Sequence, residues 1–478
     1  MTAATGAGHL DAVRMPGDRL DVDADGMLAI GGRRADALLA AHGSPLFVVV
    51  EDTLRANYRA IRDAFAARWP APINVMYSIK ANNTLAIRAI LSTEGAGGDC
   101  FGLGELHATL AGGADPRRVV MNGSDKTQAE IDAAVNCGIT INVDGDDEPE
   151  YLRSACRRWG KRARVNLRLK VLPADLDPHV SELHRTDRGF VAGVARSKWG
   201  YTVAAARPRI EALQRIDGVD LAGYSCHIGH LSKAPAAFAA VAGAFGQAVA
   251  ALAADTGFHP RVLNLGGGWA PTRDPSFRAE EPHPHTIDDY AEATVTALAR
   301  TLPAGMAPPE LWLEPGRYIV ANAVVLLATV GAVKRDAGYR WLHVDASTNL
   351  LPRIESGRFH YTLLPASRMH APASTPAEIV GSTCFRSVLG AGRAMPYLAR
   401  GDVIAILDAG MYAEAFANQF NGVPRPAAVL VSAHGVDTIR ERETITDVFR
   451  QHRIPAWLAA AAPATPADGR FGHEDRQA

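Results

Sequence analysis

Three motifs contain residue types that can carry out carbonyl chemistry. Lys80 ends the apolar run of YSIKAN, the glycines Gly266–Gly268 follow another apolar run, and LEPGR combines Glu314 with Gly316 and Arg317. A lysine in partly apolar surroundings forms Schiff bases readily. Glycines let backbone N–H groups approach a phosphate closely, and an arginine offers it a forked donor.

A lysine, a phosphate cradle and a carboxylate together are typical of a pyridoxal phosphate site. The lysine of such a site binds the cofactor aldehyde, the glycines hold the phosphate, and the carboxylate keeps the pyridine nitrogen protonated. A protonated ring is a strong electron sink for the carbanion left when a bond at the substrate Cα breaks. Taken singly, each motif has a plainer explanation: a lysine that reaches solvent, a tight turn, or a structural ion pair.

The elements that must position these motifs form a regular alternation. Eight apolar runs, the first at Ile73–Ile79 and the last at Leu311–Glu314, alternate with helix-like segments. This alternation predicts a parallel sheet, and eight units in about 245 residues favour a closed (β/α)8 TIM-type barrel, an α/β fold. The carboxyl ends of barrel strands meet at one face, so we expect the three motifs to lie together there.

The rest of the chain has a different pattern. From Ala321, strand-like runs punctuated by Gly, Pro and Asp predict a mostly β domain, joined by the N-terminal segment. We expect residues 46–320 to form the barrel, residues 1–45 and 321–460 to form the β domain, and residues 461–478 to be a disordered tail.

Composition excludes several classes of protein. The 478 residues are 47% hydrophobic and 21% charged with net charge −1, which excludes a disordered chain or a general basic surface for nucleic acid or membrane. The five cysteines lack a CxxC spacing, which fits a reduced, cytoplasmic protein without structural zinc. We expect neither a membrane span, because no apolar run approaches the required length of about 18 residues, nor a signal peptide. His227 and His230 end a strand, where their spacing does not put them on one face, so we expect no metal site.

Seven motifs occur in an order that points to one family. They are YSIKAN, GGDCFGLGEL, HIGH, LNLGGG, LEPGR, GSTC and DAGMY…FNG. Over roughly residues 45–450 the chain resembles the fold-type III pyridoxal phosphate decarboxylases, which include the diaminopimelate, ornithine and D-ornithine/D-lysine decarboxylases. The resemblance implies an alanine-racemase-like barrel and a carbon–carbon lyase that decarboxylates an amino acid. It also implies a homodimer with shared active sites.

The same resemblance implies individual roles. Lys80 binds the cofactor covalently, His227 stacks on its face, and Cys384 of the partner subunit protonates Cα after CO2 has left. The implied cofactor contacts are Lys80, Asp99, Arg168, His227, Gly266, Gly267, Gly268, Glu314, Gly316, Arg317 and Tyr412. Many relatives have serine where His230 stands, and whether His230 replaces that phosphate ligand is left open.

The segment after Cys384 departs from the family pattern. Relatives that act on basic substrates usually place a carboxylate there, whereas this chain has Phe385 and Arg386. Because an unpaired buried charge is costly, a lone distal ammonium, as in lysine or ornithine, is disfavoured. Arg386 suits a distal carboxylate and Phe385 an apolar chain, with Arg353 and Glu414 as further contacts. We therefore expect a non-standard amino acid with an acidic or modified side chain, of either chirality.

Three alternatives remain. A racemase on this fold pairs the ring nitrogen with an arginine and takes a tyrosine as its second base, whereas this chain offers Glu314 and Cys384. A non-catalytic homologue that only binds partners would not need Lys80. A sugar-phosphate barrel enzyme with a Schiff-base lysine would not need the β domain.

Overall fold

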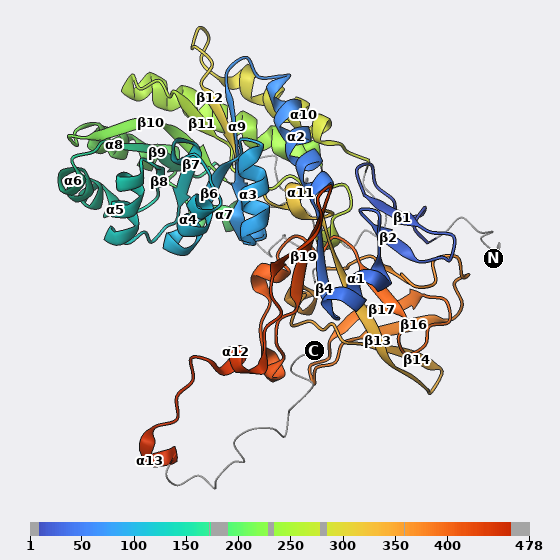
Figure 1. The fold of residues 1–478 in the computed structure, drawn as a ribbon. Coiled ribbons are helices and arrows are strands. Elements are labelled where there is room, and N and C mark those ends of the chain that lie inside the picture. The colour runs from blue at the N-terminus through green and yellow to red at the C-terminus, as the bar shows by residue number, and fades with distance from the viewer. Residues whose placement is uncertain are drawn as a thin grey trace. The chain divides into compact units, whose positions relative to one another are not determined.

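The computed structural model describes residues 9–171, 173, 190–227, 234–277, 284–357 and 359–459 (Figure 1). His230 and the predicted tail at 461–478 lie outside these residues. The chain divides into two compact units. The barrel unit comprises Thr53–Asp274 and Pro282–Ala321, and the β unit comprises Met1–Asp52, Pro275–Glu281 and Asn322–Ala478.

Eight parallel strands of the described chain close the barrel unit. They are β5 (Ile73–Ser78), β6 (Gly97–Phe101), β7 (Val119–Asn122), β8 (Thr140–Val143), β9 (Ala163–Leu169), β10 (Val219–Cys226), β11 (Val262–Asn264) and β12 (Glu310–Leu313). Pairing of β12 with β5 completes the ring. A buried cluster that includes Met76, Val120 and Trp312 packs within it. The predicted (β/α)8 barrel is confirmed.

Helices follow the strands, as Figure 1 shows. They are α2 (Glu51–Ala66), α3 (Leu85–Thr93), α4 (Gly102–Ala111), α5 (Gln128–Cys137), α6 (Glu148–Trp159), α7 (Phe190–Ala195), α8 (Val203–Gln214), α9 (Pro235–Thr256), α10 (Ile287–Thr301) and α11 (Arg317–Val320). Local signals set their ends. Thr127 and Glu130 form a capping box at the start of α5, and Gly138 ends it in the left-handed conformation.

Helix α9 corrects one expectation from the sequence. Its 22 residues are long and apolar enough to cross a membrane by length and composition. In the structure α9 packs against α10 and α8 as an outer helix of the barrel. A Cβ at Gly246 would lie 2.0 Å from Thr301 Oγ1, so the small residues of α9 allow a close approach to α10. Its apolar composition thus serves helix packing within the barrel unit.

The described residues of the β unit form two sheets. The small one joins β1 (Leu20–Val22), β2 (Leu28–Ile30) and β3 (Arg33–Arg34), and α1 (Ala35–His42) follows it. The large one contains β4 (Leu46–Val50), β13 (Val324–Asp336), β14 (Tyr339–Val344), β15 (Leu363–Leu364), β16 (Pro376–Val380), β17 (Val388–Ala394), β18 (Val403–Ile406), β19 (Ala427–Ser432) and β20 (Gly435–Arg440). A mostly β second unit is therefore confirmed.

Strand β4 lies in a different unit from the one expected. We assigned the barrel to residues 46–320, but β4 pairs antiparallel with β13 and parallel with β19 in the β unit. All five of its side chains are buried, and Leu46, Val48 and Val50 belong to the apolar core of the β unit. The division between the units therefore falls after Asp52, in the first turn of α2, and not before Leu46.

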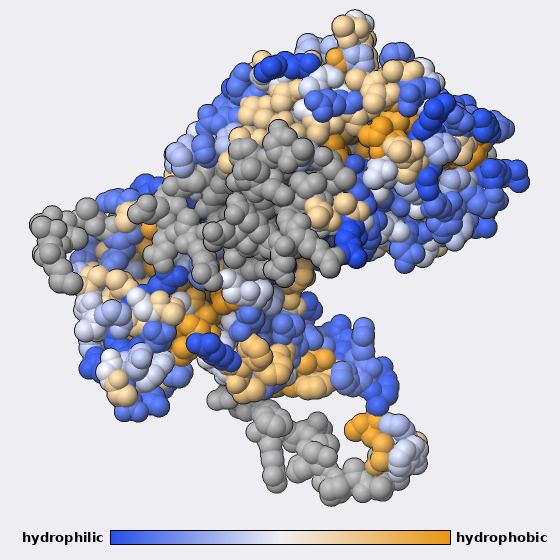
Figure 2. All heavy atoms as spheres, turned by 180° about the vertical axis from the view of Figure 1, so that it is seen from behind, coloured by the Kyte–Doolittle hydropathy of each residue, from blue (hydrophilic) through white to orange (hydrophobic). Residues whose placement is uncertain are grey.

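The last described segment carries exposed apolar side chains. Helices α12 (Ile445–Phe449) and α13 (Ala456–Ala459) lie at the C-terminal end of the β unit. Figure 2 shows apolar atoms at α13, where Trp457 is 74% exposed.

Candidate active site

Lys80 lies at the end of β5, in the short 3-10 helix η1 (Ile79–Ala81). Its Nζ donates a hydrogen bond to Asp99 Oδ2, from the neighbouring strand β6. Asp99 is fully buried, whereas the Lys80 side chain is one-third exposed. Ser78 Oγ donates to the same Asp99 oxygen at 2.5 Å. Burial alone would raise the pKa of Asp99, but the charge and hydrogen bond of Lys80, together with hydrogen bonds from Ser78 and Asn122, outweigh it and lower the pKa. Lys80 is therefore an amine beside a buried counter-charge, open on one side.

Glu314 follows β12 and is buried among amide groups. Its Oε1 accepts a hydrogen bond of 2.7 Å from Asn264 Nδ2 and one of 3.0 Å from Asn122 Nδ2. Burial, followed by the like charge of Asp99, raises the pKa of Glu314 to about 7. Lys80 and the two amides oppose this rise, because they favour the ionised carboxylate.

His227 packs closely against Gly266 and Gly267. The N–H of Gly267 donates to His227 Nδ1 at 2.9 Å, so Nδ1 is unprotonated and the neutral ring carries its proton on Nε2. Burial and the positive charges of Lys80 and Arg168 lower the pKa of His227 to about 3. A Cβ at Gly266 would lie 2.2 Å from this nitrogen, and Gly266 has φ +68°. Only glycine fits there.

The glycine N–H groups are partly engaged within the protein. Gly266 donates to Asn264 Oδ1 at 2.8 Å, and Gly267 donates to His227, so these two groups support neighbouring side chains. A Cβ at Gly267 would lie 2.0 Å from the Glu314 carbonyl oxygen. Gly268, with φ +113°, extends the same turn. The turn thus brings backbone and site side chains closer together than any other residue type would allow.

Arg317 begins α11 directly after Gly316. Its guanidinium lies 3.6 Å from the carboxylate of Asp274, and both side chains are buried. A Cβ at Gly316 would lie 2.9 Å from that of Ala81, so Gly316 keeps this turn against the Lys80 segment. The structure therefore brings the LEPGR and YSIKAN motifs together.

Arg168, on β9, forms the opposite side of the site. It lies 3.6 Å from Asp144 and 4.6 Å from the centre of the Trp199 ring. Trp199 meets Phe101 edge to face, and Lys80 Nζ lies 4.9 Å from the Phe101 ring centre. Two aromatic rings thus separate the cations of Lys80 and Arg168.

In the β unit, Arg353 and Tyr412 lie together. The Arg353 guanidinium is 5.9 Å from the Tyr412 ring centre, 5.7 Å from Phe416 and 5.3 Å from Phe359. Tyr412 has φ +55°, a strained conformation that is typical of functional sites. An arginine among aromatic rings is a suitable partner for a carboxylate or phosphate.

The remaining predicted residues of the β unit lie in two places. Glu414 forms an ion pair with Arg440, so its charge is already balanced. Cys384 is exposed, and its N–H donates to Asn421 Oδ1 at 3.0 Å. Phe385 is half exposed and meets Phe420 edge to face, and its neighbour Arg386 is exposed.

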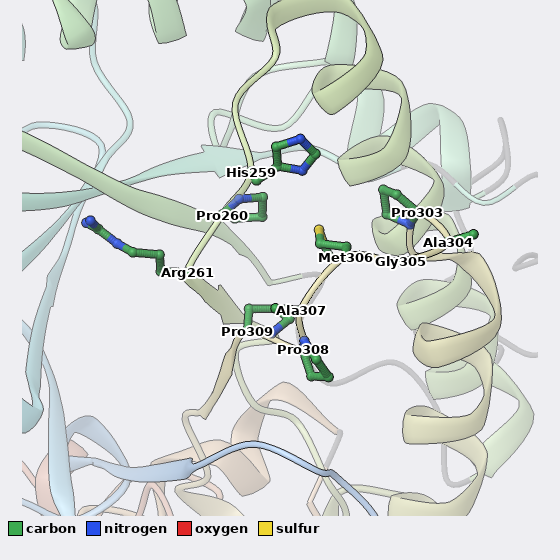
Figure 3. A pocket seen from close by; sticks show the side chains of 10 residues that line it. All are labelled: His259, Pro260, Arg261, Pro303, Ala304, Gly305, Met306, Ala307, Pro308 and Pro309. Carbon is green, nitrogen blue, oxygen red and sulfur yellow. The ribbon is translucent and has the colours of Figure 1, made fainter.

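A separate pocket of about 510 Å³ lies where β11 and β12 begin, at the opposite end of these strands from Glu314 (Figure 3). It is lined by His259, Pro260, Arg261 and residues 303–309. Arg261 extends away from the other lining side chains in Figure 3 and pairs with Asp220 at 2.6 Å. Active sites of such barrels lie at the carboxyl ends of the strands, so this pocket is not the predicted site.

The barrel residues fit pyridoxal phosphate. They combine an accessible amine, a buried carboxylate held by amide donors, a neutral imidazole and a turn in which a Cβ would meet site atoms. Sequence reasoning missed Ser78, Asn122, Asn264 and Trp199. A usable signal was present for three of them, since Ser78, Asn122 and Asn264 are each the last residue of a barrel strand.

Comparisons with known proteins agree with this geometry. Residues 51–321 match the family model described as the pyridoxal-dependent decarboxylase, pyridoxal binding domain. A diaminopimelate decarboxylase of Archaeoglobus fulgidus is 32% identical, over 91% of this chain and 99% of its own length. One of Methanothermobacter thermautotrophicus is also 32% identical, over 92% of this chain and 98% of its own.

A solved structure agrees as well. The crystal structure of diaminopimelate decarboxylase from M. jannaschii superposes with a TM-score of 0.84 at 27% identity, over 93% of this chain and 100% of its own. The chain therefore belongs to the fold-type III pyridoxal-dependent decarboxylases, and it is a pyridoxal phosphate-dependent amino-acid decarboxylase.

Proposed function

We propose that Lys80, Glu314 and His227 act directly on the bound cofactor. When bound, pyridoxal phosphate supplies an electron sink for the carbanion left at Cα as CO2 departs. Lys80 is the amine that would hold the cofactor aldehyde, and Glu314 would accept a hydrogen bond from the protonated ring nitrogen. His227 is neutral, so it covers the ring face without adding charge. The observation that carries this proposal is the buried Glu314 carboxylate, bonded by Asn122 and Asn264.

The same observation favours decarboxylation over racemisation. A racemase on this fold pairs the ring nitrogen with an arginine, which weakens the electron sink. Glu314 instead accepts two amide hydrogen bonds that stabilise its ionised form. An ionised carboxylate keeps the ring protonated and the sink strong.

The phosphate is assigned to the other end of the site. The proposed phosphate contacts are the turn Gly266–Gly268, after β11, and Gly316 and Arg317, after the neighbouring strand β12. Tyr412 of the β unit is a further phosphate contact in this proposal. Arg317 already faces Asp274, so the phosphate competes with a buried carboxylate for this cation. Asp99 and Arg168 flank the ring region, from β6 and β9.

Cys384 is assigned as the proton donor to Cα, acting from the second subunit of a homodimer. Support comes from its exposed position in a loop whose backbone is held by Asn421. A thiol that delivers a proton must lie at the surface of its own chain to reach a partner's site. The neighbouring Phe385 is half exposed, as expected of a side chain that a partner covers.

The substrate is assigned as a non-standard amino acid with an acidic or modified side chain. The loop that carries Cys384 continues with Phe385 and Arg386 and offers no carboxylate to a distal ammonium. Glu414, the carboxylate expected to contact substrate, is balanced by Arg440. Arg353 and Arg386 are cations that suit a distal carboxylate.

Diaminopimelate is the second candidate. Relatives that are 32% identical over nearly their whole length are diaminopimelate decarboxylases. The distal end of diaminopimelate bears both a carboxylate and an ammonium. The two arginines suit the first, whereas the Cys384 loop lacks a partner for the second.

A panel of amino acids tests these assignments. The holoenzyme is given both enantiomers of glutamate, 2-aminoadipate, lysine and ornithine, together with diaminopimelate, and CO2 and amine are measured. We expect turnover of acidic substrates, with a higher KM in Arg386→Ala and an unchanged KM in Arg393→Ala, a control outside the predicted site. Turnover of lysine or ornithine with the acidic compounds inert would overturn the substrate proposal. Turnover of diaminopimelate alone would select the second candidate.

A further inference from the structure

A layer of polar side chains crosses the interior of the barrel just below the site. Its members are buried, and all but one belong to barrel strands: Ser78, Asp99, Asn122, Asn142, Asn166 and Asn264, with Glu314 after β12. Ser78 is in register with Asp99, and Asn142 is in register with Asn166. Buried amides are costly unless they are hydrogen-bonded, so their arrangement here calls for an explanation.

Three asparagines of this layer form a chain of hydrogen bonds with one direction. Asn166 Nδ2 donates to Asn142 Oδ1 at 3.0 Å, and Asn142 Nδ2 donates to Asn122 Oδ1 at 2.8 Å. Asn122 Nδ2 then donates to Asp99 Oδ1 at 2.8 Å and to Glu314 Oε1 at 3.0 Å. Every amide nitrogen in the chain points toward the two carboxylates.

The carboxylates dictate this direction. An ionised carboxylate only accepts hydrogen bonds, so Asn122 must turn its nitrogen toward Asp99 and Glu314. Its oxygen then faces Asn142, which must in turn present its own nitrogen. At the far end, Asn166 Oδ1 has no hydrogen-bond partner among the described residues. An unsatisfied buried acceptor costs free energy, and this cost accompanies the common orientation of the three asparagine amides.

We propose that Asn142 and Asn166 are positioning residues that act on Glu314 through Asn122. They hold the amide nitrogen of Asn122 toward Glu314, so that Glu314 remains an ionised acceptor for the cofactor ring nitrogen. This inference rests on the proposed role of Glu314. Without the donor from Asn142, the oxygen of Asn122 loses its partner, and its amide is free to rotate. A rotated Asn122 would place an oxygen against both carboxylates and repel them.

The surroundings of Glu314 show why such a device is needed. The titratable groups around it are Asp99, Lys80 and the buried thiols Cys100 and Cys226. Burial and Asp99 favour protonated Glu314, and burial raises the pKa of both thiols, which therefore stay neutral. Apart from Lys80, the amide hydrogen bonds are the contacts that favour the ionised carboxylate.

The test measures the proton on the cofactor ring. The holoenzyme is prepared with pyridoxal phosphate labelled with ¹⁵N in the ring, and the ¹⁵N chemical shift reports ring protonation. In Asn142→Leu we expect the ratio of protonated to unprotonated ring to fall about tenfold, the effect of one pKa unit on Glu314. Asn166→Leu should shift the signal in the same direction by less, and it keeps the test decisive if Asn142→Leu does not fold.

Asn74→Leu is the matched control. Asn74 is a buried asparagine near the start of β5, where it accepts a hydrogen bond of 3.0 Å from Arg118 Nε. Its replacement should leave the ¹⁵N signal unchanged. If Glu314→Gln shifts the signal but neither Asn142→Leu nor Asn166→Leu does, the positioning inference is wrong and the role of Glu314 stands. If Glu314→Gln leaves the signal unchanged, the proposed function itself fails.

Discussion

Replacing Glu314 by glutamine should stabilise the cofactor-free protein at high pH while it removes activity. Burial is the largest of the effects that raise the pKa of Glu314 from 4.5 to about 7. Because the pKa of this acid is higher in the folded than in the unfolded protein, its protonated form contributes to the free energy of unfolding. That contribution is fully present below pH 4.5 and is lost as pH rises through the folded pKa of about 7. Between about pH 5 and about pH 8 this linkage amounts to about 2.5 kcal/mol. The substituted glutamine side chain cannot ionise, and its oxygen can still accept from Asn122 and Asn264.

The assay is denaturant unfolding of cofactor-free wild type and Glu314→Gln at both pH values. The difference in free energy of unfolding between variant and wild type should grow by about 2.5 kcal/mol from the lower to the higher pH. Glu292→Gln is the control, because Glu292 is 66% exposed and pairs at the surface with Arg68. Parallel pH dependence in wild type and Glu314→Gln would refute the reasoning, since it would mean that burial does not penalise the ionised carboxylate.

Two further variants have defined outcomes. Lys80→Ala should lose the visible absorbance band of the bound cofactor, whereas a retained band would move the covalent attachment elsewhere. Gly267→Ala should lower the cofactor affinity measured by titration at least tenfold and cost about 1–3 kcal/mol of stability, because its Cβ would lie 2.0 Å from the Glu314 carbonyl oxygen. Gly243→Ala in α9 is the control. Its Cβ would lie 3.9 Å from that of Ala297, so it should change neither the affinity nor the stability in this way. Equal effects of the two substitutions would contradict the assignment of the turn Gly266–Gly268 to the cofactor phosphate.

The barrel could be predicted because its signals are local. Each parallel strand is an apolar run followed by its own helix, and the last strand closes against the first. Strand β4 gave the same local signal, since Leu46–Val50 is apolar and α2 follows it directly. Its partners are β13 and β19, far along the chain, and no local pattern reveals such pairing.

The site was predictable where a charged residue follows an apolar strand. Lys80 and Glu314 carry such signals, and the structure links them through hydrogen bonds of Asp99 and Asn122. Asp99 lies within β6 and was expected from the family resemblance alone. Asn122 and Asn264 are uncharged residues at the ends of β7 and β11, and their hydrogen bonds to Glu314 depend on the closure of the barrel. The pairing of Glu414 with Arg440 could not be foreseen either, since it depends on the folding of the β unit.

The central claim is that Glu314 keeps the cofactor ring protonated and thereby favours loss of CO2 from Cα over racemisation. The most direct test follows CO2, amine and the optical rotation of the remaining amino acid in one reaction of the holoenzyme with its best substrate. We predict one CO2 for each amine formed and no racemisation of the remaining substrate, with both products lost in Lys80→Ala. Loss of optical activity without release of CO2 would contradict the account.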